Sequence, residues 1–171
     1  MLHLRPAGIG DIAAVLPRTL ALNAHEGIAV DAAVLEAALD RLLRDPAIGG
    51  VWLIERSETE GGAPDGSAGG AGGSAPRGIE QDAVVIGYAI ATFGYDLEFA
   101  GRDALLTELW IDPPARGSGA GRAALALLDP ELRARGVHAL HLQVRPDNPA
   151  LQLYRRSGFV ASPRITMTRR L

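Results

Sequence analysis

Apolar residues recur along the chain with two periods, and the longer period predicts two helices near the N-terminus. Five large apolar residues between positions 34 and 43 fall at helical spacing, which predicts a helix over 32–44 with Asp31 as its N-cap. A similar pattern predicts a helix over 12–24, with Asp11 as its N-cap.

The shorter period, together with runs of β-branched residues, predicts the strands. They are expected at 2–5, 51–56, 83–95, 105–111 and 137–144, and residues 159–170 add one strand or two. Because a run of strands separates the helices, this order favours an α+β fold with a mixed sheet over an alternating parallel one.

Two further helices are expected in the C-terminal half. One runs from the glycines near position 119 to about Arg135, and Pro130 is expected to kink it or to restart it from Asp129. The other lies within 146–158, with Asn148 as its cap and Pro149 as its first residue.

The segment 57–82 has a different composition from the rest of the chain. It holds eight glycines and almost no large apolar side chain, so it is predicted to be a disordered loop, and a solvated insertion is favoured over a functional lid. Neither flanking part looks like a complete domain. The sequence therefore predicts one domain over 1–171 with a Gly/Ser-rich insertion at 57–82.

Composition narrows the function. The 171 residues are 47% hydrophobic, which suits one globular core, and the net charge of -3 gives no reason to expect nucleic acid. The chain has neither cysteine nor lysine, which excludes disulfides, thiol catalysis and Schiff-base chemistry. Its four histidines show no metal-ligand spacing. No apolar run reaches the roughly 20 residues of a membrane span, and no signal peptide is evident, so a cytoplasmic protein is expected.

The stretch DPPARGSGAGRAALALL, residues 112–128, carries the strongest chemical signal. Alternating glycines in front of a helix leave bare backbone N–H groups at the positive end of the helix dipole, which suits a pyrophosphate. A P-loop is excluded because no Gly-Lys-Ser/Thr is present. Residues 119–124 also fit a dinucleotide fingerprint, but an acidic ribose partner about 20 residues on is missing.

A third match covers two motifs. Arg116-Gly-Ser-Gly-Ala-Gly121 fits Arg/Gln-x-x-Gly-x-Gly/Ala after the strand ELWIDP, and Asn148 to Phe159 follows some 30 residues later. Together they resemble the GNAT superfamily of acetyl-CoA-dependent N-acetyltransferases. The resemblance implies a mixed, mostly antiparallel sheet of six or seven strands with helices on both faces. It also implies that two parallel strands, 105–111 and 137–144, splay apart to admit the cofactor.

The same resemblance implies where acetyl-CoA binds. The pantetheine arm is expected along the strand backbone at Leu109, Trp110 and Ile111. Asn148 is expected to be a helix cap alone or a cap that also touches the cofactor. The pyrophosphate is expected on the glycine loop, at Arg116, Gly117, Ser118, Gly119, Ala120, Gly121 and Arg122.

It also implies the residues of the chemistry. Tyr154 matches the tyrosine that protonates the leaving thiolate, although its apolar neighbours also suit core packing. Glu108 and, more weakly, Glu26 are candidates to face the acceptor amine; Glu108 is equally compatible with a strand residue that points away from the cleft. The Ile111 N–H is the candidate to polarise the acetyl carbonyl. His141, in mid-strand, is expected to be structural.

The predicted function is therefore N-acetyl transfer from acetyl-CoA to an amine of a small molecule or a peptide, by direct attack in a ternary complex. A non-catalytic module that binds or senses acyl-CoA is the alternative. A homodimer is compatible with the resemblance, because dimers are frequent in the superfamily. No metal, nucleic acid or membrane partner is expected.

Overall fold

The computed structural model describes residues 1–57 and 83–171, and the strands of this part form one five-stranded sheet in the order β1-β2-β3-β4-β5. Neighbouring strands are antiparallel except β4 and β5, which are parallel. The strands are β1 (Leu2–Pro6), β2 (Gly49–Ser57), β3 (Ala83–Asp96), β4 (Gly101–Ile111) and β5 (Val137–Leu142). The α+β class and the mixed sheet are confirmed, but the described residues contain fewer than the six or seven strands expected.

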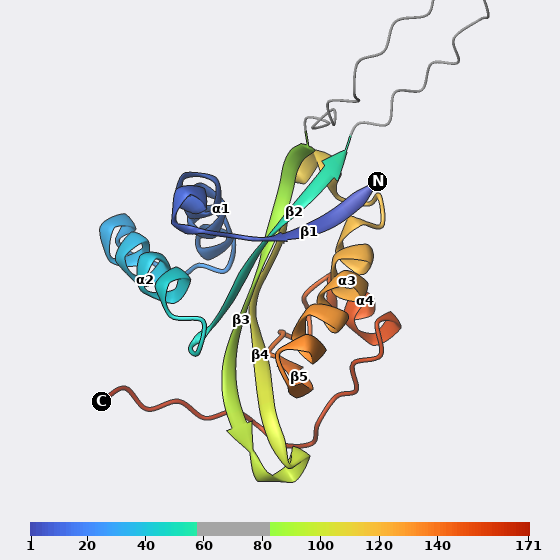
Figure 1. The fold of residues 1–171 in the computed structure, drawn as a ribbon. Helices are drawn as coiled ribbons and strands as arrows, with labels where there is room; N and C mark the ends of the chain where they lie inside the picture. The colour runs from blue at the N-terminus through green and yellow to red at the C-terminus, as the bar shows by residue number, and fades with distance from the viewer. Residues whose placement is uncertain (58–82) are drawn as a thin grey trace, which may run out of the picture.

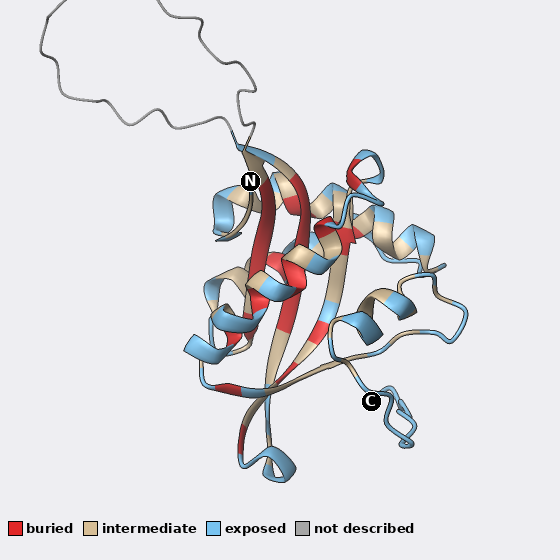
Figure 2. Cartoon of the chain, turned by 90° about the vertical axis from the view of Figure 1, so that its right-hand side faces the viewer, coloured by how far each residue is buried: buried red, intermediate tan, exposed pale blue. Residues whose placement is uncertain are grey.

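Helices cover both faces of the sheet, as predicted (Figure 1). Helices α1 (Ile12–His25) and α2 (Ala32–Arg44) lie on one side, and α3 (Ala120–Ala134) and α4 (Leu151–Arg156) on the other. The central strands are buried between these layers (Figure 2). None of the described helices is both long and apolar enough to cross a membrane.

Alternation along β2 divides the core between the two faces. Val51 and Leu53 pack with Val15 and Leu39 on the side of α1 and α2, whereas Trp52 packs with the leucines of α3 on the other side. Successive side chains of a strand point to opposite faces, so one strand supplies both cores.

The predicted bounds of α2 are confirmed. Asp31 Oδ1 accepts hydrogen bonds from the backbone N–H groups of Ala33 at 2.9 Å and Val34 at 3.2 Å. These two N–H groups have no partner inside the helix, so the side chain fixes its first residue.

Asp11 is the N-cap residue of α1, as predicted, but its side chain does not cap the helix. Its carboxylate makes no hydrogen bond to the first turn of α1. It accepts instead from the Arg5 guanidinium at 2.9 and 2.8 Å and from the Gly8 N–H at 2.8 Å. A short 3-10 turn, Ile9–Asp11, precedes the helix and directs this side chain back toward β1.

Residues 57 and 83 are direct partners in the β2–β3 ladder, so the intervening segment joins two neighbouring strands, as expected. The predicted insertion 57–82 otherwise lies outside the described residues, apart from Ser57, which ends β2.

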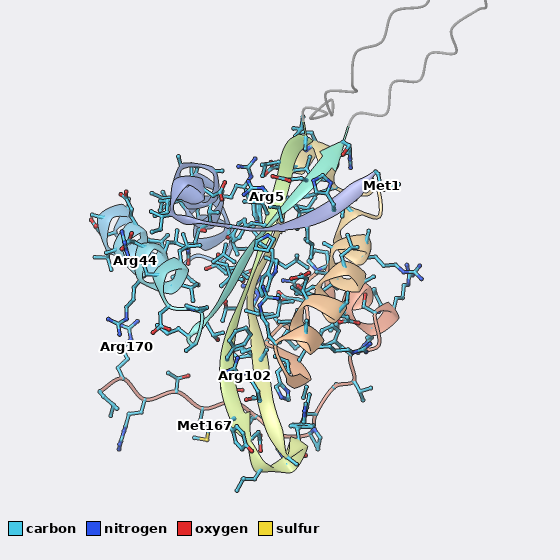
Figure 3. The ribbon with its side chains drawn as sticks, viewed as in Figure 1. Met1, Arg5, Arg44, Arg102, Met167 and Arg170 are labelled. Carbon is cyan, nitrogen blue, oxygen red and sulfur yellow. The ribbon has the colours of Figure 1, made fainter. Side chains whose placement is uncertain are left out.

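The C-terminal segment 159–171 is not a strand, so this prediction is wrong. Its alternating apolar residues suit a half-buried strand, but Ile165 is 82% exposed and Met167, which Figure 3 labels, is 86% exposed. Side-chain hydrogen bonds from Gln143 to Thr166 and from Arg164 to Glu98 attach the segment to the fold. Without a backbone ladder, alternation alone does not make a strand.

Two details of the later helices also differ from expectation. Helix α3 continues through Pro130 to Ala134, so of the two expected effects of Pro130 a restart at Asp129 is wrong, and a kink stays a prediction. Helix α4 begins at Leu151, later than predicted, and Asn148 Oδ1 accepts from the Ala150 N–H at 2.8 Å in the preceding turn. Asn148 therefore caps that turn and not the helix itself.

Candidate active site

The site is built on a gap between β4 and β5. The two strands pair from Arg102 opposite Val137 to Leu106 opposite Leu142, and β4 then continues to Ile111 without a partner in β5. The expected parallel pair is confirmed, with its pairing confined to the first half of β4, because β5 ends at Leu142 and not at 144 as predicted.

Backbone groups of β4 face this gap. The Asp112 N–H donates to the Ile86 carbonyl on β3 at 2.8 Å. Backbone polar groups of a strand alternate between its two neighbours, so those of Ile111 and Leu109 point the other way, toward the gap. Unpaired strand backbone of this kind can hold an extended ligand.

A β-bulge decides which way Glu108 points. Ile90 pairs with Glu108 and Ala91 pairs with Leu106, so Thr107 is an extra residue in β4. Without the bulge, Glu108 would share the face of Leu106, which packs among the leucines of α3. With it, Glu108 lies on the face toward α1 and receives a hydrogen bond from the Tyr88 hydroxyl.

The environment of Glu108 favours its neutral form. Burial raises the pKa of the Glu108 carboxyl, and hydrogen bonds from Tyr88 and Thr19 partly oppose the rise. Burial and the neighbouring Glu108 charge raise the pKa of the Tyr88 phenol well above its ordinary value, so Tyr88 remains a proton donor.

The glycine loop leads from β4 into α3 through a 3-10 turn, Pro113–Ala115. Gly117 and Gly119 have φ of +72° and +83°, a region that other residues rarely adopt. Glycine at position 121 allows close packing against α4, because a Cβ there would lie 3.1 Å from Leu153 Cδ2. The N-cap of α3 is Gly119, so the helix has no side-chain cap, which suits an anion at its N-terminus.

Arg116 lies along the end of β4. Its Nε donates to the Ile111 carbonyl at 2.9 Å, and its guanidinium stacks over the Trp110 ring at 4.4 Å from the centroid. The Trp110 ring is fixed in turn, because its Nε1–H donates to Asp112 Oδ1 at 3.0 Å. Arg18 of α1 binds the same carboxylate, with its closest contact at 2.6 Å. One network thus joins α1, the end of β4 and the glycine loop.

An open cleft of about 1770 Å³ brings most of the predicted residues together. The following predicted residues line it: Glu26, Glu108, Leu109, Trp110, Ile111, Arg116, Gly121, Asn148 and Tyr154. Ser118, Gly119 and Ala120 line a smaller hollow of about 270 Å³ beside Arg56, and Gly117 and Arg122 line neither. Among residues 1–57 and 83–171, no three His, Asp or Glu side chains are grouped as a metal site.

Tyr154 lies on the α4 side of the cleft. Its ring meets Phe159 edge-on at 5.9 Å, so it also takes part in packing, as the alternative interpretation expected. Burial and the charge of Glu26 raise the pKa of the Tyr154 phenol. The phenol therefore keeps its proton at neutral pH. His141 also lines the cleft, and its Nε2 lies 3.7 Å from Asp103 Oδ2.

Two buried residues of the site, Tyr88 and Thr19, were not predicted from the sequence. Tyr88 lies in an apolar strand and Thr19 in an apolar helix, so the sequence pattern predicts that both are core residues. The bulge at Thr107 sets their contact with Glu108, and one extra residue in a strand leaves no signal in the hydrophobic pattern.

Comparison with protein families gives one match. The model of the acetyltransferase (GNAT) family matches residues 36–159, which include β4, the glycine loop and α4. A search of the curated proteins gives no match.

Solved structures with similar folds cover nearly the whole chain. An integron cassette protein from the mobile metagenome of Cole Harbour Salt Marsh is 25% identical, with a TM-score of 0.73 over 99% of this chain and 90% of its own. A predicted acetyltransferase with acetyl-CoA from Clostridium acetobutylicum is 18% identical, with a TM-score of 0.70 over 99% and 96%. An aminoglycoside N-acetyltransferase in complex with CoA is 13% identical, with a TM-score of 0.71 over 99% and 95%.

Proposed function

The chain belongs to the GNAT family of acetyltransferases, with acetyl-CoA as the acetyl donor, and on this premise we propose that it acetylates an amine of a small molecule or a peptide. The amine attacks the thioester directly, in a ternary complex. The observation that carries the proposal is the cleft at the β4–β5 gap, which has a carboxyl, Glu108, and a phenol, Tyr154, in its lining.

The donor is held by backbone. The N–H and C=O groups of Leu109 face the gap and pair with the pantetheine arm, and the Ile111 N–H is the donor available to the acetyl oxygen, while the Ile111 carbonyl accepts from Arg116. The N–H groups from Gly117 to Arg122 bind the pyrophosphate, and the Arg116 guanidinium adds a charge beside them. The positive φ of Gly117 and Gly119 supports this role, because it turns the loop without side chains.

Glu108 acts as the base. An amine with a pKa near 10 is protonated at neutral pH and must lose a proton before it attacks. A carboxylate whose pKa is raised by burial is a stronger base than an exposed one, which supports this assignment. Glu26, at the end of α1, lines the same cleft and contributes negative charge toward the acceptor.

Tyr154 acts as the acid. When nitrogen forms its bond to the acetyl carbon, the carbon–sulfur bond breaks and a thiolate departs. The Tyr154 phenol gives its proton to that sulfur. The raised pKa of Tyr154 supports the role, since the hydroxyl is still protonated when the thiolate forms.

The acceptor is an amine, and two classes define the first panel. One solved neighbour is a ribosomal-protein-alanine N-acetyltransferase from Brucella melitensis, and another is an aminoglycoside acetyltransferase in complex with sisomicin. With TM-scores of 0.64 and 0.66 at 15% and 12% identity they share the fold, so both peptides and aminoglycosides belong in the panel.

Release of free thiol from acetyl-CoA, measured over this panel, tests the function. We expect one class of amine to accelerate release, and Glu108→Gln to lower turnover by roughly 10² or more. Full binding of acetyl-CoA without release for any amine would favour the non-catalytic acyl-CoA-binding module instead.

A further inference from the structure

We propose that Tyr88 is a positioning residue, which aims the Glu108 carboxylate into the cleft and favours its ionised form against the effect of burial. This inference rests on the proposed role of Glu108 as the base. It adds to the reaction a residue of the buried core.

The geometry restrains Tyr88 firmly. Its side chain is 0% exposed and packs in the cluster of Val15, Leu53 and Ile90 between the sheet and α1. From this fixed ring the hydroxyl reaches Glu108 and donates to it. A donor with so little freedom holds the carboxylate in one orientation, whereas a water molecule in the cleft would not.

The hydrogen bond also acts on ionisation. Burial alone would favour neutral Glu108, which cannot accept a proton. The Tyr88 hydroxyl stabilises the ionised form and lowers the pKa of Glu108 against the effect of burial. Because the pKa of Tyr88 itself is strongly raised, this residue donates at every relevant pH and does not compete as a base.

The other groups near the cleft do not replace this donor. Thr19 of α1 is the second group that lowers the pKa of Glu108, but its hydroxyl has a single proton and also lies 3.2 Å from the Val15 carbonyl. Arg18 is bound to Asp112. The other titratable side chains of the cleft lining, among them His25, Glu26, His141, Tyr154 and Arg116, are not among the groups that move the pKa of Glu108. Burial, Tyr88 and Thr19 are what move the pKa of Glu108.

Tyr88→Phe tests the proposal, because it removes one oxygen and keeps the ring. We expect the acid limb of kcat/KM for the acceptor to move to higher pH by about one unit, the scale of a lost hydrogen bond to a charged group. The KM for acetyl-CoA should stay constant. Tyr95→Phe is the matched control, since Tyr95 is 73% exposed and lies outside the cleft lining, and its acid limb should not move.

A double-mutant cycle separates positioning from a merely structural role. If Tyr88 acts through Glu108, Tyr88→Phe should have no further effect on turnover in the Glu108→Gln background. An equal loss of turnover in both backgrounds would overturn the proposal. Unchanged turnover in Glu108→Gln alone would instead show that Glu108 is not the base. That outcome would not contradict the proposed binding of acetyl-CoA.

A direct titration of Glu108 needs no acceptor. Carbon-13 NMR of the glutamate carboxyls, with Glu108→Gln for assignment, should show the Glu108 pKa higher in Tyr88→Phe than in the wild type. An unchanged pKa would overturn the proposal. If Tyr88→Phe fails to fold, 3-fluorotyrosine at position 88 serves in its place. A more acidic phenol donates more strongly, so the Glu108 pKa should then fall. If the pKa does not fall, the proposal is overturned.

Discussion

At the scale of single residues, the glycines before α3 meet two different physical needs. Gly117 and Gly119 have positive φ, so a side chain there would strain the backbone even though space is open around them. Gly121 has ordinary backbone, but a Cβ there would press on Leu153. The loop is therefore specified by conformation at two glycines and by packing at the third.

Gly119→Val should abolish acetyl-CoA binding while the protein still folds, because the β-branched side chain blocks phosphate approach and disfavours the positive φ. Isothermal titration with acetyl-CoA measures the effect. Gly136→Val is the matched control, since Gly136 has φ +75° at the other end of α3 with equally open space. The two variants should lose similar stability, and only the first should lose binding. Wild-type affinity in Gly119→Val would mean that the loop is not the pyrophosphate site.

Tyr154→Phe should lower turnover by roughly 10² or more, because it removes the proton donor for the leaving thiolate. Acetyl-CoA affinity should change far less, since the strand backbone and the glycine loop are the proposed binding site of the cofactor. Steady-state turnover, titration with acetyl-CoA and thermal melting on the same variant check this. Loss of stability on the order of 1 kcal/mol with full turnover would assign the hydroxyl to packing.

At the scale of elements, the Asp11 carboxylate joins the N-terminal end of α1 to β1 through its hydrogen bonds with Arg5. Its pKa is lowered by the hydrogen bonds from Arg5, so its stabilising effect is complete at neutral pH and is lost as pH falls through that lowered value. Asp11→Asn should lower the free energy of unfolding by on the order of 1 kcal/mol at neutral pH, and by less below the ordinary carboxyl range near 3.9. Urea unfolding at both pH values measures this. Asp40→Asn, whose ion pair with Arg44 is exposed, should change little. An equal deficit of Asp11→Asn at both pH values would contradict the assignment.

Deleting residues 61–75 should leave folding and acetyl-CoA affinity nearly unchanged. The two strands that this segment joins are paired directly, Ser57 with Ala83, and the deleted residues contain no large apolar side chain. Thermal melting and titration with acetyl-CoA test the variant. A drop in Tm of more than several degrees would show that the segment contributes to the core.

Local signals predicted elements well, and pairings between distant segments account for the errors. Helix 32–44 has both a cap and a period in its own residues, so its bounds were predicted. The C-terminal segment 159–170 has a strand-like period, but a strand also needs a partner edge, which local sequence does not specify. The face of Glu108 depended on the bulge at Thr107, and the late start of α4 depended on the turn that Asn148 closes.

At the scale of the whole molecule, two layers of helices meet at a gap in one sheet. Glu108 points to the side of α1, and Tyr154 belongs to α4 on the other side, so the proposed base and acid come from opposite layers. The sequence motifs predicted the residues of the site on the side of α3 and α4. Tyr88 and Thr19, on the side of α1, were not predicted, because only the packing of the fold brings them to Glu108.

Acetyl-CoA should raise the melting temperature of the whole protein, because it binds only the folded chain. At a concentration of 100 Kd the added stability is about 2.7 kcal/mol, which for a chain of this size corresponds to roughly 5–10 °C. A thermal shift assay measures it, with NAD at equal concentration as the control. A shift with NAD and none with acetyl-CoA would revive the dinucleotide-binding interpretation of residues 119–124.

The stack of the Arg116 guanidinium on the Trp110 ring makes tryptophan fluorescence a probe of the glycine loop. The chain has two tryptophans, and Trp52 is fully buried beneath α3. A phosphate that draws the Arg116 guanidinium away from the Trp110 ring changes the emission of that indole, while Trp52 contributes a steady background. In a Trp52→Phe background the remaining fluorescence would follow the loop alone, so the protein carries an intrinsic optical probe at the place where its pyrophosphate is proposed to bind.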